Sequence, residues 1–118
     1  MKDLYQAELL DHFKHPRNYG SIENAEISSE EYNPSCGDSI QLFLVLEDDK
    51  IVQVNFVGKG CVISQAAASM FTEKIKNMNL DEAKKISVEF MKELVGIDLG
   101  PNRLQCATLP LIALQKVN

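Results

Sequence analysis

The feature that most constrains the fold is a pair of alternating segments, residues 39–46 and 51–57, separated by the polar residues 48–50. Successive side chains of a strand point to opposite faces, so alternation of this kind gives each strand one apolar face. Two such segments joined by a short polar turn predict an antiparallel β-hairpin. The alternating apolar residues are Ile40, Leu42, Leu44 and Leu46 in the first strand and Val52, Val54 and Phe56 in the second.

Helical spacing is found on both sides of this hairpin. Residues 4–13 predict an amphipathic helix that ends before Pro16, and its candidate packing residues are Leu4, Leu9, Leu10 and Phe13. A further short extended segment begins at Ile27.

After Cys61 the pattern changes to apolar residues three and four positions apart, which predicts a helix. The residues of this stripe are Ile63, Ala66, Ala67, Met70, Phe71 and Ile75. Another helix is expected from Asp81 to about Gly96, with Ala83, Ile86, Phe90 and Leu94 facing inward. The last helix is expected to open at Cys106 or Ala107, with Pro110 in its first turn. This order predicts one α+β domain over residues 1–118, a small antiparallel three-stranded sheet packed against helices.

Composition narrows the class of protein. The chain has 118 residues, of which 45% are hydrophobic, as expected for a single globular domain. Its apolar stretches are too short for a membrane span, and its first residues do not resemble a secretory signal, so we expect a cytoplasmic protein. The net charge of −5 argues against nucleic-acid binding. Residues 1–60 carry 11 acidic and 5 basic side chains, a net −6 that could steer a basic partner or form a solvated face.

Three cysteines, Cys36, Cys61 and Cys106, lie in three separate segments, and Asp38 lies two residues after the first. Thiolates favour zinc, copper(I) or iron–sulfur centres over magnesium or calcium. An odd number of cysteines in a reducing compartment argues for ligation or catalysis and against disulfides. The alternatives are that the cysteines are buried small hydrophobic residues and that Asp38 is a turn or cap residue.

The positions of these residues suit metal binding. Cys61 and Cys106 are both expected at helix N-termini, where the helix dipole stabilises a thiolate. Cys36 and Asp38 can converge on one ion because Gly37 lies between them. The cysteines are 25 and 45 residues apart (61 − 36 and 106 − 61), unlike the paired knuckles of zinc fingers, so the folded domain must bring them together. Ligands on glycine-rich loops favour a site that exchanges what it holds.

Other polar residues have weaker signals. Lys59 and Arg103 could each stabilise a thiolate or be exposed without a role. His12 and His15 are three residues apart and are expected at the surface or at an interface. A Cys–His hydrolase is disfavoured because no further residue frames a catalytic pair.

Together these segments resemble the U-type iron–sulfur cluster assembly scaffolds, the family of IscU and of the N-terminal domain of NifU. Residues 4–20 look like the opening helix and turn of that family, and residues 33–38, 58–66 and 103–109 look like its three ligand motifs. The pattern from Cys106 to Leu109 is similar to that of the SufU branch. Gln105 replaces the histidine that precedes the third cysteine in IscU proteins. Residues 100–103 replace their Leu-Pro-Pro-Val-Lys motif, so docking of a dedicated chaperone is not expected. The chain also lacks the insertion that SufU proteins carry between the second and third cysteines.

The resemblance implies an α+β fold with Cys36, Asp38, Cys61 and Cys106 as ligands at one exposed end. It implies a partner cysteine desulfurase, whose persulfide sulfur is accepted by Cys36 or alternatively by Cys106. In a scaffold, a [2Fe–2S] cluster would then be assembled and passed to apo acceptor proteins. In the alternative, a SufU-type zinc-dependent sulfurtransferase, the same residues would hold zinc and activate the desulfurase without a stable cluster. A scaffold or carrier is favoured over a true enzyme.

Overall fold

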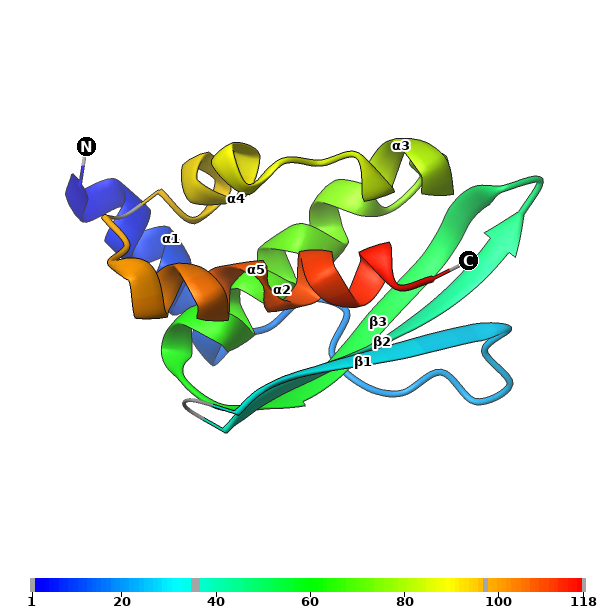
Figure 1. Cartoon of the computed structure of the whole chain (residues 1–118), viewed down its shortest axis with the longest axis horizontal. Coiled ribbons are helices and arrows are strands. Elements are labelled where there is room, and N and C mark those ends of the chain that lie inside the picture. The colour runs from blue at the N-terminus through cyan, green and yellow to red at the C-terminus, as the bar shows by residue number, and fades with distance from the viewer. Residues whose placement is uncertain (1, 35–36, 97, 118) are drawn as a thin grey trace.

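The structure, a computed structural model, describes residues 2–34, 37–96 and 98–117. It is an α+β fold in which helices cover one face of a three-stranded antiparallel sheet of order β1-β2-β3 (Figure 1). The predicted fold class is therefore confirmed. The elements are α1 (Lys2–Lys14), β1 (Ile27–Asn33), β2 (Asp38–Glu47), β3 (Lys50–Lys59), α2 (Val62–Ile75), α3 (Leu80–Lys84), α4 (Val88–Val95) and α5 (Pro101–Gln115).

The predicted hairpin is β2 and β3. Asp48 and Asp49 join the strands with φ angles of 52° and 66°, the left-handed conformation that a two-residue type I′ turn requires. Alternation is interrupted once, between Val45 and Leu46, where Val52 is an extra residue opposite the partner strand. This bulge turns Ile51, instead of Val52, into the core.

Helix α2 is the centre of the helical layer. It packs against α1, α4, α5 and β3, and every residue of its predicted apolar stripe is buried. The fully buried residues Ala66, Ala67 and Ala68 are small, which permits close approach of neighbouring elements.

Helix α1 differs from the prediction in how it packs. Leu9 is buried, whereas Leu4, Leu10 and Phe13 are exposed. The helix contacts α2, and most of its residues whose burial the structure describes are exposed. The sequence pattern could not show this, because an apolar stripe does not reveal whether a second element covers it.

The helix predicted from Asp81 to Gly96 is two helices, α3 and α4. Asn79, and not Asp81, caps α3 by accepting a hydrogen bond from the Asp81 N–H at 2.9 Å. The Ser87 hydroxyl accepts the Phe90 N–H at 3.0 Å and starts α4, which ends at Gly96 in the left-handed conformation. The serine cap explains why one apolar pattern gives two helices.

Within the described residues, no helix combines the length and the apolar character needed to cross a bilayer.

Candidate metal centre

Asp38 and Cys61 meet where the second strand begins and helix α2 starts. Asp38 is the first residue of β2 and is only 2% exposed. Cys61 is the N-cap of α2, as predicted from the sequence. The Cys61 N–H donates to Asp38 Oδ1 at 3.1 Å, and the Cys61 thiol donates to Asp38 Oδ2 at 3.3 Å. The carboxylate thus satisfies an amide at the start of α2 and contacts a candidate ligand.

Two glycines at the end of β3 permit close packing around this contact. Gly60 has a φ of +136°, and a Cβ at this position would lie 2.1 Å from Asp38 Oδ1. A Cβ on Gly58 would lie 2.6 Å from the Ser39 carbonyl oxygen. Gly60 leaves the space into which the Asp38 carboxylate fits, and Gly58 permits the close approach of β2 at Ser39 and Ile40.

Cys106 completes the group, from a position that differs from the prediction. Helix α5 begins at Pro101 and not at Cys106 or Ala107, so Cys106 lies in its second turn and Pro110 lies inside the helix. The helix-terminus argument for a Cys106 thiolate is therefore wrong. Cys106 is nevertheless turned toward the site, and the ligand atoms of Asp38, Cys61 and Cys106 all lie within 4.8 Å of one another.

This donor set fits a thiophilic metal. Two thiols and a carboxylate supply three of the four ligands that zinc or an iron–sulfur centre requires. The fourth predicted ligand and persulfide acceptor, Cys36, lies outside the described residues. Asn33 and Asp38 pair across β1 and β2, and the Gly37 N–H donates to the Asn33 carbonyl at 2.8 Å.

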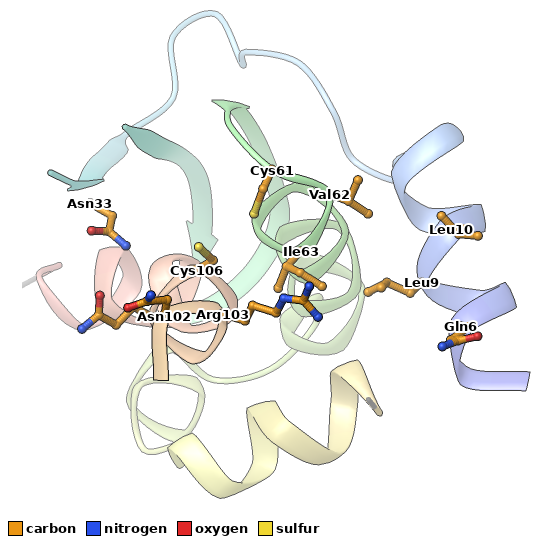
Figure 2. Close-up of a pocket in the computed structure, with 11 residues that line it drawn as sticks. Gln6, Leu9, Leu10, Asn33, Cys61, Val62, Ile63, Asn102, Arg103 and Cys106 are labelled. Atoms are coloured by element: carbon orange, nitrogen blue, oxygen red, sulfur yellow. The ribbon is translucent and has the colours of Figure 1, made fainter. Parts of the chain in front are cut away.

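A pocket of about 640 Å³ opens at these thiols (Figure 2). Its lining residues come from α1, the end of β1, the start of α2 and the start of α5: Gln6, Leu9, Leu10, Asn33, Cys61, Val62, Ile63, Asn102, Arg103, Gln105 and Cys106. Arg103 therefore lies at the site, whereas Lys59 lines a different pocket with Tyr19 and Glu30. The contribution of α1 was missed at the sequence level, although Gln6, Leu9 and Leu10 have the spacing of one helix face.

The two histidines lie away from the thiols. His12 Nδ1 is 2.7 Å from the Ser69 hydroxyl, which also accepts the Arg17 N–H at 2.8 Å. Burial, and secondarily the positive charge of Arg17, lowers the pKa of His12 below its ordinary value. His12 thus lies half-buried where α1 packs against α2, whereas His15 is exposed, as expected for a surface residue.

The structure thus combines a small α+β domain with a group of two thiols and one carboxylate that could hold a metal. The family described as NifU-like N terminal domain matches residues 4–117, and the chain belongs to this family. The chain is thus a member of the iron–sulfur cluster scaffold family that includes IscU and SufU proteins.

The similar proteins include relatives named as sulfurtransferases and relatives named as cluster assembly scaffolds. The chain is similar to the zinc-dependent sulfurtransferase SufU of Bacillus subtilis, with 38% identity over 96% of this chain and 88% of the relative. It is also similar to the iron–sulfur cluster assembly scaffold protein IscU 1 of Archaeoglobus fulgidus, with 34% identity over 96% and 73%. Among solved structures, a putative iron–sulfur cluster assembly scaffold protein for the SUF system from Fervidobacterium islandicum superposes with a TM-score of 0.83. Its identity to this chain is 31%, and 93% of each chain is covered.

The lengths of these alignments differ. The match to the Bacillus protein runs over 130 residues, more than the 118 of this chain, so that relative has residues that this chain lacks. The match to the Archaeoglobus protein runs over 113 residues. Within the aligned region, the match to the Archaeoglobus protein therefore contains no comparable insertion.

Proposed function

We propose that this protein accepts sulfur from a cysteine desulfurase, assembles a [2Fe–2S] cluster at Cys36, Asp38, Cys61 and Cys106, and passes the cluster to apo acceptor proteins. The observation that carries the proposal is the convergence of the Asp38, Cys61 and Cys106 ligand atoms within 4.8 Å, with both thiols lining an open pocket. The proposed setting is the cytoplasm, where thiols remain reduced.

Sulfur transfer needs an accessible thiolate. The acceptor attacks the outer sulfur of the donor persulfide, a new S–S bond forms as the old one breaks, and the donor cysteine leaves as a thiolate. Of the two described thiols, Cys61 is exposed and Cys106 is buried. Burial disfavours Cys106 as the first acceptor, so Cys36 remains the proposed acceptor and Cys61 becomes its alternative.

Cluster assembly makes different demands on the same residues. Each transferred sulfur takes up two electrons from an external donor to become sulfide, and iron binding displaces protons from the thiols. Asp38 Oδ1 accepts a hydrogen bond from the Cys61 N–H, and Asp38 Oδ2 accepts one from the Cys61 thiol. A carboxylate among thiolates is the hardest and most easily exchanged ligand of the set, which suits a site that must release its cargo.

The second candidate is a zinc-dependent sulfurtransferase that stimulates a desulfurase. It is favoured by the 38% identity to the Bacillus protein of that name. In this case one zinc would be the resident metal, bound by the same four residues, and would hold the thiols deprotonated and in place.

Anaerobic incubation with a cysteine desulfurase, L-cysteine, ferrous iron and a reductant distinguishes the two. The scaffold function predicts visible charge-transfer bands with equal amounts of iron and sulfide, abolished in Cys36→Ala, Cys61→Ala and Cys106→Ala. A colourless protein that retains about one zinc and speeds desulfurase turnover would establish the sulfurtransferase instead. Three variants that each accept sulfur and bind metal like the parent would refute both.

A further inference from the structure

A buried serine lies beside Cys61 in the first turn of α2, and the proposed function does not use it. The side chain of Ser64 is fully buried. Its hydroxyl donates to the carbonyl oxygen of Cys61 at 3.1 Å, and its oxygen lies 3.9 Å from the Cys61 sulfur. One buried hydroxyl is thus near both the backbone and the side chain of a candidate metal ligand.

The hydrogen bond from Ser64 to the Cys61 carbonyl is not needed to satisfy that carbonyl. The Gln65 N–H already donates to the same oxygen at 3.2 Å, which is the ordinary backbone bond of a helix. The hydroxyl can therefore turn away without leaving a buried acceptor unpaired. Rotation about its C–O bond redirects the proton, and a small rotation of the side chains shortens the distance to the sulfur.

The direction of the contact between Cys61 and Ser64 depends on whether Cys61 carries its proton. In the structure the thiol is the donor, to Asp38 Oδ2 at 3.3 Å and more distantly to the Ser64 oxygen. Metal binding displaces this proton to solvent, because the thiolate is the form that coordinates. The sulfur can then only accept hydrogen bonds, and an ionised carboxylate has none to donate. Of these two partners, Ser64 is the one with a proton to give.

We propose that Ser64 is a positioning residue of the metal centre, whose hydroxyl donates to the Cys61 sulfur when that thiolate binds the metal. The inference rests on the metal centre of the proposed function and applies to an iron–sulfur cluster and to zinc alike. The Gln65 side-chain amide donates to the Ser64 oxygen at 3.4 Å, so this oxygen keeps a donor while its own proton faces the sulfur. A hydrogen bond of this kind orients the ligand and withdraws charge from the metal–sulfur bond. Ser64 thus holds in place a ligand that is otherwise exposed.

Cobalt(II) tests this inference, because it occupies zinc-type thiolate sites and its charge-transfer band reports on the sulfur ligands. Ser64→Ala removes the hydroxyl, and Ser64→Thr keeps it. Ser69→Ala is the matched control, since Ser69 is also a fully buried serine of α2, but its hydroxyl contacts His12 and the Arg17 N–H. Each protein is titrated anaerobically with cobalt chloride to obtain its spectrum and its cobalt dissociation constant. Denaturant unfolding of the metal-free proteins is measured in parallel.

In Ser64→Ala we expect the sulfur-to-cobalt band to move to longer wavelength, because a thiolate without the hydrogen bond gives up charge more easily. The dissociation constant should rise about tenfold, the low end for loss of a residue that supports a ligand. Ser64→Thr should keep the parental band. Ser69→Ala should lose stability and leave the band and the affinity unchanged.

A parental band and affinity in Ser64→Ala would overturn the inference and leave the metal centre standing. An equal change in Ser69→Ala would also overturn it, because the effect would then come from a weakened helix and not from the hydroxyl. So would a shifted band in a folded Ser64→Thr; if the added methyl group prevents folding, the comparison of the two alanine variants decides. A parent that shows no thiolate band with cobalt would refute the metal centre itself, and this inference with it.

Discussion

The two sides of the thiol pocket are built differently. On one side, Cys61 and Cys106 sit on α2 and α5, which pack against each other and against the sheet. On the other side, α1 contacts α2 and, among its side chains that the structure describes, buries Leu9 alone. The ligand side is therefore held by the core, whereas the α1 side is held by one leucine and by the contact between His12 and Ser69. The difference indicates that the positions of the two cysteines are fixed by the core of the fold. Helix α1, which forms the other side of the pocket, is less strongly attached.

The largest expected effect comes from the ligand side. Gly60→Ala places a Cβ against the Asp38 carboxylate at a φ of +136°, which other residues rarely adopt. We expect a loss of about 1–3 kcal/mol in the free energy of unfolding and at least a tenfold loss of metal affinity. Denaturant unfolding and competition with a zinc chelator measure these two quantities.

Gly100→Ala is the matched control for this change. A Cβ there meets nothing within 4 Å, so its stability and metal affinity should stay near the parental values. Parental metal affinity in Gly60→Ala would show that the carboxylate need not occupy its observed position.

The next effect tests the weaker attachment of α1. Leu9→Ala removes the buried anchor of this helix and is expected to cost about 2 kcal/mol, at the low end for buried leucines because the helix is peripheral. Amide hydrogen exchange should speed up in α1 and remain slow in α2 and β2.

Leu4→Ala serves as the comparison, because Leu4 is exposed and its truncation should leave exchange in α1 unchanged. If Leu9→Ala instead accelerated exchange through α2 and the sheet, α1 would be part of the core and the contrast between the two sides would be lost.

Some features of the fold and of the site could be predicted from the sequence, and others could not. The hairpin, the α2 stripe and the position of Cys61 were predicted, because alternation and helical spacing report directly on faces that the core covers. The packing of α1, the start of α5 at Pro101 and the burial of Ile51 were not. The start of α5 was missed although proline is common at the first position of a helix. The packing of α1 and the burial of Ile51 depend on a tertiary contact and on a bulge, neither of which leaves a periodic signal. The fit of Asp38 against Gly60 belongs to the same group, since it joins residues 22 positions apart (60 − 38).

A smaller effect is expected from pH. Because burial lowers the pKa of His12 in the folded protein, the unfolded chain binds more protons below the ordinary histidine value of about 6.5. Stability is therefore expected to be constant above that value and to fall as the pH drops below it, until His12 is protonated in the folded protein as well. Thermal unfolding followed from pH 7.5 to pH 5.5, roughly a pH unit on either side of the ordinary value, measures this slope.

His12→Gln should flatten the slope, whereas His15→Gln, at the exposed end of the same segment, should retain it. An identical slope in the parent and in His12→Gln would mean that other groups cause the pH dependence.

The central claim is that three thiolates and one carboxylate bind one metal centre. X-ray absorption spectroscopy of the protein loaded anaerobically with zinc tests it most directly. The predicted spectrum contains about three sulfur ligands near 2.3 Å and one oxygen ligand near 2.0–2.2 Å, with one sulfur fewer in Cys106→Ala and in Cys61→Ala. A first shell of nitrogen and oxygen alone, or a sulfur count that neither variant changes, would contradict it.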